Sequence, residues 1–333
     1  MTPEKKASRS IKRVLVIFPG ALGDLICLMP ALAAISLRHP GALVELMARL
    51  ELAKLAAGRT VVARAHSIDA RAVGELFTEP GARSDETTVN LNARRFFTDF
   101  DRIYSFFASD DRRFRARLAA ATDGHVSFHP FRPSGDGHVS AAYLQATEIE
   151  IDETALPVDA RLEPTPDDLA AAARTIVQSR CDRSNLIVIF PGSGSPGKNW
   201  PADKFAALAS KLSLSNRASV AAVLGPAEMS LEPIFRESGV PVLKHLDLPT
   251  VAAIARLAAA FVGVDSGVSH LAAAAGASGV VIFGPTDPAR WRPNPLSLGA
   301  GGQIVILRRN PIDSIEADEV AGALSKFVAQ PQT

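Results

Sequence analysis

Short apolar runs alternate with longer amphipathic stretches along most of the chain. The runs at 13–18, 43–47 and 186–190 are rich in valine, isoleucine and leucine and hold few polar residues. Strands that are buried on both faces of a sheet have this composition. Stretches of helical length follow, for example at 25–37 and 202–212. A strand, a turn and a helix in this order open a βαβ unit, so the chain is predicted to be an α/β protein with parallel sheets.

The same rhythm predicts the remaining elements. Further strands are expected at 60–65, 102–107, 219–224, 240–243, 260–264, 280–283 and 304–307, and further helices at 50–57, 114–121, 230–236, 251–258, 268–275 and 314–328. The stretch 77–90 is rich in turn-forming residues and is left unassigned. The stretch 128–137 is expected to be a loop because it contains prolines and glycines.

An acidic stretch with three prolines interrupts the pattern at 148–168 and is predicted to link two domains. The chain has 333 residues, which suits two domains at roughly 100–200 residues each. We therefore predict two Rossmann-like domains, at 1–155 and 156–333, whose parallel sheets face a central cleft.

The charge of the chain is nearly balanced, with 36 Lys and Arg against 35 Asp and Glu. A balanced chain has no broad basic field, so nucleic acid is not an expected partner. The first thirteen residues are the local exception and contain Lys5, Lys6, Arg9, Lys12 and Arg13. This leader is interpreted either as a solvated tail or as a weak contact with anionic lipid head groups.

The two cysteines, Cys27 and Cys181, form no disulfide framework, which is consistent with a reducing compartment. The basic start runs directly into a predicted strand and does not resemble a signal peptide. No apolar stretch reaches the ~18–20 residues of a membrane span. The expected location is therefore the cytoplasm, with a peripheral contact at the inner face of the inner membrane if the basic leader binds lipid.

Open α/β sheets bind ligands at loops that follow strands. In the first such loop, Gly20 and Gly23 permit close approach of the backbone to a ligand, and Asp24 enters the first turn of a helix. Asp24 is either a cap that accepts a backbone N–H or, in a cleft, a general base. The glycine spacing is not the dinucleotide-binding one, although Glu45 in the second strand keeps an NAD-binding oxidoreductase open.

The second loop, at 190–201, holds three glycines, two serines and Lys198. Backbone N–H groups, hydroxyls and an ammonium together suit a phosphate. The loop lacks Walker A spacing, so nucleotide hydrolysis is not implied. The alternative is a solvated surface loop. Trp200 is expected to pack at the start of the next helix rather than to stack on a ligand.

The third loop ends a strand with Asp265, Ser266 and Gly267, and a helix of small residues begins at once. The N–H groups at such a helix start are placed to bind a diphosphate. His270 lies four residues after Ser266 on the same helix face and is either a core residue or a ligand contact. Hydrolysis by a Ser-His-Asp triad is excluded, because residues this close in sequence cannot form the relay.

The fourth loop, at 283–291, contains the turn signal Asp287-Pro288 and is either a structural turn or a closing loop over the ligand. Glu228 follows a strand and is a candidate for the ribose hydroxyls or a solvated acid. The pair Asp110-Asp111 is not a D-x-D metal motif and precedes a basic helix, so it is expected to be an N-terminal charge pair. No His, Cys or acidic residues have metal-ligand spacing, so no metal is expected.

Three loops together resemble those of glycosyltransferase family 9, the ADP-heptose:lipopolysaccharide heptosyltransferases. They are Pro-Gly-Ala-Leu-Gly-Asp24, Lys198-Asn-Trp200-Pro, and Gly263-Val-Asp265-Ser-Gly-Val-Ser-His270, the last followed by Phe283-Gly-Pro-Thr-Asp-Pro. The resemblance covers both domains and is strongest from 190 to 291. It implies a GT-B fold in which the N-terminal domain binds the acceptor and the C-terminal domain binds the donor. GT-B chains often end in a helix that returns to the first domain, a role open to 314–328.

The resemblance also implies inverting, metal-independent sugar transfer without a cofactor. By matching motifs, it implies that Asp24 is the general base, with Gly20 and Gly23 in the acceptor-side loop. The donor-binding residues that it implies are Ser193, Lys198, Glu228, Asp265, Ser266, Gly267 and His270. The implied partners are ADP-heptose and a lipopolysaccharide-core or other glycan or lipid-linked acceptor.

The lead into the first loop, Phe18-Pro-Gly-Ala, departs from the Lys-Ser or Pro-Ser lead of many family members that act on lipopolysaccharide. The acceptor and the donor sugar therefore stay open. So do three alternatives to a transferase: a GT-B-like sugar-nucleotide epimerase, an NAD-binding oxidoreductase and a non-catalytic nucleotide-binding relative.

Overall fold

The computed structural model describes residues 11–78, 87–135, 137–150, 160–214, 218–294 and 302–328. Contacts divide the chain into two compact units. The first comprises the described residues of Met1–Pro19, Leu32–Pro133 and Ala146–Ile149. The second comprises those of Gly20–Ala31, Ser134–Gln145 and Glu150–Thr333. The glycine loop with Asp24 thus groups by contacts with the C-terminal half of the chain. The predicted domain boundary at 155 lies outside the described residues.

The first unit is built on a five-stranded parallel sheet in the order β3-β2-β1-β4-β5. Its strands are β1 (Arg13–Ile17), β2 (Leu43–Ala48), β3 (Val62–Ser67), β4 (Arg102–Ser105) and β5 (Val126–Phe128). The strand order reverses direction between β1 and β4, as in doubly wound folds. Leu15 and Ile17 of β1 are fully buried, which explains the apolar run in the sequence.

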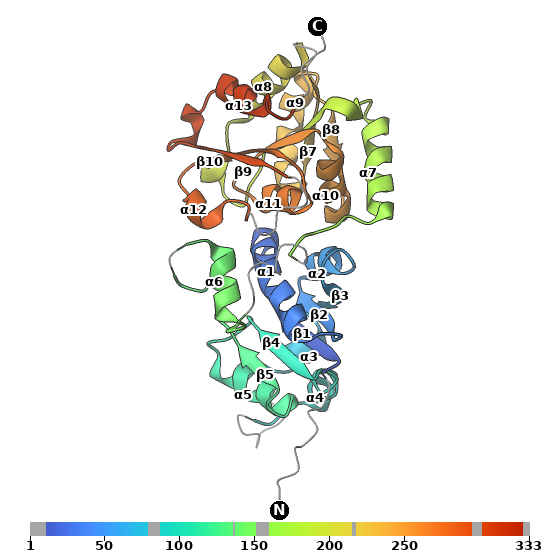
Figure 1. Cartoon of the computed structure of the whole chain (residues 1–333), viewed down its shortest axis with the longest axis vertical. Coiled ribbons are helices and arrows are strands. Elements are labelled where there is room, and N and C mark those ends of the chain that lie inside the picture. Colours follow the sequence, from blue (N-terminus) through green and yellow to red (C-terminus); the bar gives the residue numbers. More distant parts are fainter. Residues whose placement is uncertain are drawn as a thin grey trace, which may run out of the picture. The chain divides into compact units, whose positions relative to one another are not determined.

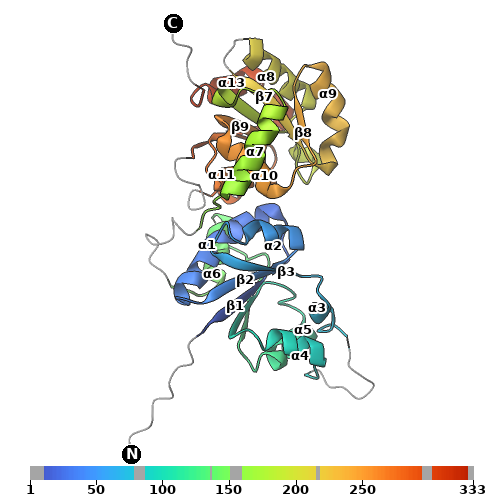
Figure 2. The same ribbon diagram turned by 90° about the vertical axis from the view of Figure 1, so that its right-hand side faces the viewer.

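Helices cover both faces of this sheet (Figures 1 and 2). They are α1 (Leu22–Arg38), α2 (Leu50–Ala56), α3 (Arg71–Gly74), α4 (Leu91–Phe97) and α5 (Arg112–Ala121). Phe97 of α4 and Phe114 of α5 pack with Leu15 and Ile17 in one buried cluster. Asp111 caps α5 by accepting the Phe114 N–H at 2.8 Å, as its position in the sequence predicted.

The second unit is built on a six-stranded parallel sheet in the order β11-β10-β9-β6-β7-β8. Its strands are β6 (Leu186–Phe190), β7 (Ser219–Leu224), β8 (Val242–Lys244), β9 (Ala260–Val264), β10 (Gly279–Phe283) and β11 (Ile304–Arg308). Here the order reverses between β6 and β9. The two parallel sheets confirm the predicted α/β class.

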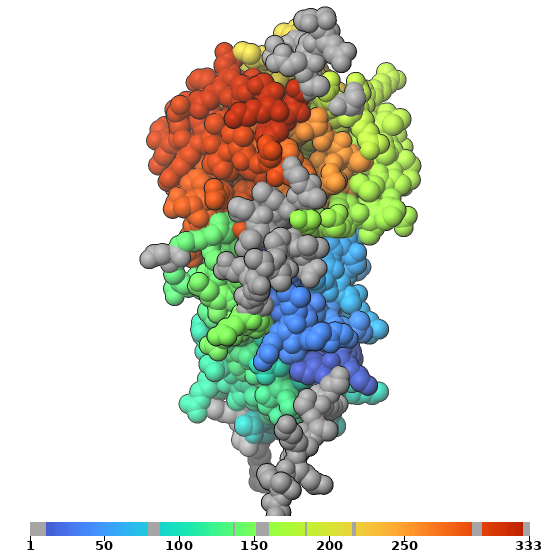
Figure 3. Space-filling model, in the orientation of Figure 1, coloured from blue at the N-terminus to red at the C-terminus, as the bar shows by residue number. Residues whose placement is uncertain are grey.

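The remaining helices are α6 (Val139–Ala146), α7 (Pro166–Gln178), α8 (Ala202–Leu214), α9 (Glu232–Glu237), α10 (Leu248–Leu257), α11 (Gly267–Ala274), α12 (Pro288–Trp291) and α13 (Ala317–Leu324). Val320 and Leu324 of α13 are fully buried with Phe205 and Leu208 of α8. The last helix therefore uses its apolar face within the second unit, where it lies at the surface (red in Figure 3).

Some elements escaped the sequence analysis. Helix α7 begins inside the stretch interpreted as a linker, because Thr165 and Asp168 form a capping box: each side chain accepts the other residue's backbone N–H, at 3.3 and 2.8 Å. Pro166, Asp167 and Asp168, at the end of the predicted linker, thus form a helix start. Strand β5 and helices α4 and α6 were also missed, and the helix expected at 230–236 begins as a 3₁₀ turn over Pro226–Leu231.

Candidate functional site

The loops singled out in the C-terminal half follow β6, β7, β9 and β10 at one edge of the second sheet (Figure 1). The first and third of them flank the point between β6 and β9 where the strand order reverses. Open α/β sheets bind ligands at such a reversal, because the two flanking loops diverge and leave a crevice. The strand order therefore identifies the Lys198 and Asp265 loops as the candidate ligand-binding loops.

A buried carboxylate joins three of these loops. The Lys198 ammonium lies 2.8 Å from Oδ2 of Asp265, and the Thr286 hydroxyl donates to the same oxygen at 2.6 Å. Asp265 is only 6% exposed, whereas the Lys198 side chain is 31% exposed. The fold thus brings together Lys198 and Asp265, as expected, and adds Thr286, which the sequence analysis did not single out. The sequence signals at this position were the family motif Phe283-Gly-Pro-Thr-Asp-Pro and the turn at Asp287, which caps α12.

The start of α11 is fixed by serine side chains. Ser266 is the N-cap, and its hydroxyl accepts the Ser269 N–H at 3.4 Å. The Ser269 hydroxyl donates back to the Val264 carbonyl at 2.7 Å. A Cβ on Gly263 would lie 2.4 Å from that hydroxyl, so only glycine fits there. The positive end of the helix dipole is therefore held in place beside Asp265.

The glycine loop before α1 packs against this helix start. A Cβ on Gly267 would lie 2.9 Å from the Gly23 nitrogen and 3.0 Å from Cβ of Leu22. Gly267 is therefore needed for close approach of the two backbones. The N-termini of α1 and α11 meet at this contact, so two helix dipoles direct positive potential to the same region. This arrangement suits an anion.

Asp24 lies in the first turn of α1 and is partly exposed. Its Oδ2 accepts the Ala21 N–H at 3.0 Å. The capping role that the sequence left open is therefore present, and the second carboxylate oxygen has no hydrogen bond recorded among the described residues. Gly20, in the same loop, belongs to the segment that clusters with the second unit.

His270 is buried on the first turns of α11 and is 5% exposed. Its Nδ1 lies 3.9 Å from Sγ of Cys27 on α1. Burial lowers the pKa of His270 to about 4, despite the opposing effect of the Asp265 carboxylate. Burial likewise raises the pKa of Cys27 to about 12. At pH 7 the imidazole is thus neutral and the thiol is protonated, so neither contributes a charge to an anion site.

Ser193 and Glu228 lie at neighbouring loops. The Ser193 hydroxyl lies 2.7 Å from both the Ser195 carbonyl and Oδ1 of Asn199, within its own loop. The Glu228 carboxylate lies directly over Gly192, where a Cβ would be 2.2 Å from its Oε1. The fold therefore brings Glu228 from the loop after β7 onto the loop after β6.

Trp200 and Glu45 have structural roles. Trp200 is 2% exposed, packs on Phe205 with ring centroids 4.8 Å apart, and donates to the Ile315 carbonyl. It is a core residue, as expected. Glu45 is fully buried and pairs with Arg13 at 2.7 Å and His66 at 2.6 Å. Because its oxygens are occupied, Glu45 gives no support to binding of a ribose.

Over the residues that the structure describes, no group of three His, Cys, Asp or Glu side chains is arranged to hold a metal ion. In the same residues, no helix is long and apolar enough to cross a membrane.

A family model for glycosyltransferase family 9 (heptosyltransferase) matches residues 139–310, more than half of the chain. The chain belongs to glycosyltransferase family 9. The predicted family is therefore confirmed, and the chain is a glycosyltransferase. A search of curated proteins found no match.

Solved structures show that the family 9 chain has a GT-B-like fold. A family 9 glycosyl transferase from Veillonella parvula DSM 2008 aligns with a TM-score of 0.76 at 16% identity, over 95% of this chain and 97% of that one. Escherichia coli ADP-heptose lps heptosyltransferase II aligns with 0.67 at 18%, over 95% and 98%. E. coli heptosyltransferase WaaC with ADP-2-deoxy-2-fluoro heptose aligns with 0.61 at 19%, over 94% and 99%. At these identities the likeness shows the fold alone.

Proposed function

We propose that this family 9 enzyme transfers heptose from ADP-heptose to a lipopolysaccharide-core or other glycan or lipid-linked acceptor, with inversion and without a metal ion. The observation that carries the proposal is the meeting of Lys198, Asp265 and the N-termini of α1 and α11 beside the β6–β9 strand reversal. The solved structures of an ADP-heptose lps heptosyltransferase and of a heptosyltransferase with ADP-2-deoxy-2-fluoro heptose support the choice of donor.

The donor diphosphate would lie at the start of α11. There the Ser266 and Gly267 backbone, at the positive end of the helix, stabilises the negative charge. Lys198 is partly exposed and sits on a loop, so it can exchange Asp265 for a phosphate oxygen. As the sugar departs from the diphosphate, charge builds up on the leaving oxygen, and fixed donors there lower the barrier.

The remaining donor contacts follow from the neighbouring loops. Glu228 reaches the loop after β6 and would accept hydrogen bonds from ribose hydroxyls. The Ser193 hydroxyl would turn from its own loop toward the phosphates. Asp265, once released by Lys198, would bind a sugar hydroxyl while Thr286 holds its orientation. His270 contributes as a neutral, buried neighbour of α11 rather than as a cation.

Asp24 would act as the general base. One carboxylate oxygen is held by the Ala21 N–H, and the other takes the proton from the acceptor hydroxyl. The acceptor oxygen then bonds to the anomeric carbon as the bond from that carbon to the diphosphate breaks on the opposite face. A base positioned in this way contributes roughly 10²–10⁴ in rate.

The donor is tested by thermal unfolding with ADP, UDP, GDP or NAD added separately. A ligand at ~100 times its dissociation constant stabilises the folded protein by about 2.7 kcal/mol. We expect ADP to raise the melting temperature and the others not to. A shift with UDP or GDP instead would reject heptose as the donor sugar, and a shift with NAD alone would favour an oxidoreductase.

The base is tested with Asp24→Asn, which keeps the side-chain shape but cannot take a proton. We expect transfer to fall roughly 10²–10⁴-fold while ADP still stabilises the protein. Asp111→Asn is the matched control, because Asp111 also accepts a backbone N–H at a helix start. If Asp24→Asn transferred sugar as fast as Asp111→Asn, Asp24 would be only a cap. Transfer that survives EDTA would support the metal-independent mechanism.

We further propose a cytoplasmic enzyme with a peripheral membrane contact through its basic leader. Arg13 does not belong to that contact, because its guanidinium pairs with Glu45 at the start of β1. Lys5, Lys6 and Arg9 lie outside the described residues. Co-sedimentation with vesicles containing anionic lipid tests the proposal, and binding unchanged after replacement of these three residues by Gln would reject it.

A further inference from the structure

A hollow of about 630 Å³ lies in the first unit, at the edge of its sheet where β1 and β4 begin. Ile11 precedes β1 there, and Asp101 and Arg102 begin β4. This is the amino edge of the sheet, opposite the carboxyl edge where α/β sheets bind substrates. Its volume falls within the roughly 300–1,000 Å³ of small-molecule sites. None of the loops assigned to sugar transfer contributes to it.

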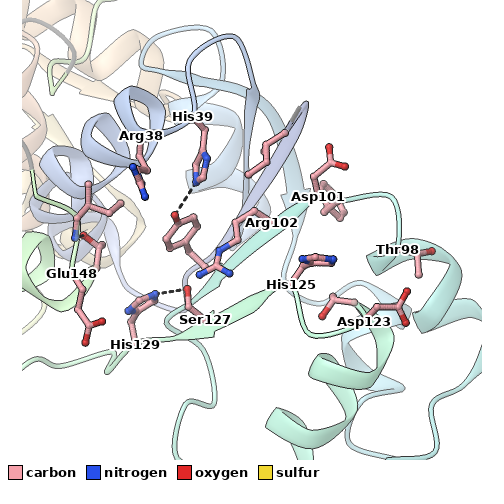
Figure 4. Close-up of a pocket in the computed structure, with 16 residues that line it drawn as sticks. Arg38, His39, Thr98, Asp101, Arg102, Asp123, His125, Ser127, His129 and Glu148 are labelled. Atoms are coloured by element: carbon pink, nitrogen blue, oxygen red, sulfur yellow. Dashed lines mark hydrogen bonds between the residues drawn. The ribbon is translucent and has the colours of Figure 1, made fainter. Parts of the chain in front are cut away.

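Two guanidinium groups enter this hollow. Arg38 comes from the last turn of α1 and Arg102 from β4, and Figure 4 shows both beside the space that His129 and Glu148 also border. Among the described residues, neither arginine has a carboxylate within ion-pair distance. The Arg102 guanidinium instead lies over the Tyr104 ring, 5.2 Å from its centroid. A cation at the end of α1 is explained by the helix dipole, but that dipole does not explain Arg102.

The acidic residues of the hollow are mostly engaged elsewhere. Oδ2 of Asp101 accepts the Lys12 and Arg13 N–H groups at 2.8 and 3.0 Å, and Asp123 pairs with Arg94 at 3.5 Å. Among the described residues, the Glu148 side chain forms no hydrogen bond or ion pair, and it is exposed. The lining holds two guanidinium groups and three carboxylates. Figure 4 shows Asp101 and Asp123 on the side of the hollow away from Arg38, so Glu148 is the carboxylate that borders the same space as the two arginines.

Neutral hydrogen-bonding groups form the rest of the wall. Nε2 of His39 lies 2.8 Å from the Tyr104 hydroxyl. Nδ1 of His129 lies 2.6 Å from the Ala146 carbonyl and Nε2 lies 2.8 Å from the Ser127 hydroxyl. Burial lowers the pKa of both histidines, so at pH 7 they are neutral. Such groups match the hydroxyls of a sugar better than an apolar ligand.

We propose that this hollow is a second ligand site of the enzyme, which binds the oxyanion of a phosphorylated saccharide between Arg38 and Arg102. Paired guanidinium groups are the donors best suited to phosphate oxygens. The polar wall formed by His39, Tyr104 and Ser127 would bind the sugar hydroxyls. The ligand is either a free sugar phosphate or a phosphorylated sugar within a larger glycan. The inference does not rest on the proposed donor or base.

The test is calorimetric titration of the full chain at pH 7 with glucose 6-phosphate, glucose and inorganic phosphate. We expect glucose 6-phosphate to bind, glucose not to bind, and phosphate to bind more weakly. The double variant Arg38→Gln/Arg102→Gln should weaken binding about tenfold or more, since one charged hydrogen bond accounts for about that factor. Arg95→Gln is the matched control, because Arg95 is an exposed arginine outside the hollow.

Two further measurements distinguish loss of the proposed site from misfolding and from binding at Lys198. The double variant should keep the circular dichroism spectrum and melting temperature of Arg95→Gln. Titration should also be unchanged in Lys198→Ala, which removes the phosphate group's alternative partner in the second unit. The proposal is overturned if glucose 6-phosphate does not bind, if the double variant binds as the wild type does, or if only Lys198→Ala loses binding. Equal affinity for inorganic phosphate overturns the saccharide assignment.

A phosphorylated oligosaccharide and its dephosphorylated form then distinguish the two sources. Tighter binding of the phosphorylated oligosaccharide than of glucose 6-phosphate, lost in the double variant, assigns the hollow to a glycan. The reverse order assigns it to a free sugar phosphate.

Discussion

Each of the two units contains a buried carboxylate that contacts one cationic side chain and one further hydrogen-bonding side chain. In the first unit, Glu45 is held by a cation, Arg13, and by His66. In the second, Asp265 is held by a cation, Lys198, and by Thr286. Both carboxylates are buried, at 0% and 6% exposure, and both have close partners. Burial and pairing therefore do not by themselves distinguish a structural carboxylate from a functional one.

What differs is the attachment of the partners. Arg13, Glu45 and His66 lie within three adjacent strands, β1, β2 and β3, so hydrogen bonds of the sheet fix all three. The Arg13 guanidinium binds both oxygens of Glu45 and has little freedom to leave. Lys198 ends a 3₁₀ turn in a loop and makes a single contact that a ligand oxygen can replace. On the proposed function, an exchangeable cation at a carboxyl edge is what distinguishes the donor-binding carboxylate from the structural one.

Removal of the exchangeable cation should have the largest effect. Lys198→Ala is expected to lower kcat/KM roughly 10²–10³-fold, as loss of one fixed donor to a developing charge does. Lys244→Ala is the matched control, because Lys244 is also 31% exposed and pairs with a carboxylate, Glu232. Steady-state kinetics with saturating acceptor measures both. Similar losses of kcat/KM in Lys198→Ala and Lys244→Ala would contradict the distinction between an exchangeable and a structural cation.

The histidines near the two carboxylates extend the comparison to the pH dependence of stability. His66 contacts its carboxylate at 2.6 Å, whereas His270 is buried as the neutral form with its pKa lowered to about 4. Because the unfolded chain binds a proton near pH 6.5 and the folded chain does not, stability is lost as the pH falls from about 6.5 to 4.

His270→Gln should therefore reduce the acid-induced loss of unfolding free energy between pH 7 and pH 4 by about 3 kcal/mol. Urea unfolding at several pH values measures it. His125→Gln, at an exposed position, is the control. An unchanged pH slope in His270→Gln would show that the imidazole is solvated or paired in solution.

Glu45→Gln should destabilise the protein without a direct effect on transfer. We expect the free energy of unfolding at pH 7 to fall by about 2 kcal/mol, because charged hydrogen bonds to Arg13 and His66 are lost. Burial opposes ionisation of Glu45, but those two hydrogen bonds lower its pKa overall. The stabilisation is therefore present above the ordinary carboxyl range and is lost as the pH falls through the lowered pKa.

Urea unfolding at pH 7 and pH 3 checks both parts of this expectation, with the difference between wild type and Glu45→Gln shrinking at pH 3. Glu316→Gln is the control, since Glu316 is 70% exposed and forms a surface ion pair with Lys204 of small value. Loss of specific activity in correctly folded Glu45→Gln would contradict the structural assignment.

Thr286→Val should have the smallest effect. It keeps the shape of the side chain but removes the hydroxyl that orients Asp265, and we expect kcat/KM to fall about tenfold, as for one lost hydrogen bond. The melting temperature should match that of Thr175→Val, whose hydroxyl bonds within α7. An unaltered kcat/KM would mean that the Thr286 hydroxyl does not orient Asp265 during transfer.

Much of the fold could be predicted from sequence because buried parallel strands leave apolar runs. Strands at 219–224 and 260–264 match β7 and β9 residue for residue. Elements with weaker signals were missed: β5 has three partly buried residues, and α7 begins with a proline and two acids that also suit a linker. Proline and acidic residues occur both in helix caps and in loops. The local sequence therefore does not decide between the two without the packing of neighbouring elements.

The sequence by itself determined the alternation of strands and helices, the family, and the four loops that follow strands, because these depend on local patterns and short motifs. Only the tertiary structure decided which residues meet. Thr286 reaches Asp265 across 21 positions, Gly267 proves necessary because Gly23 lies against it, and Arg38 and Arg102 enter one hollow. Strand order sets these distances, and strand order results from packing over the whole chain rather than from any single segment.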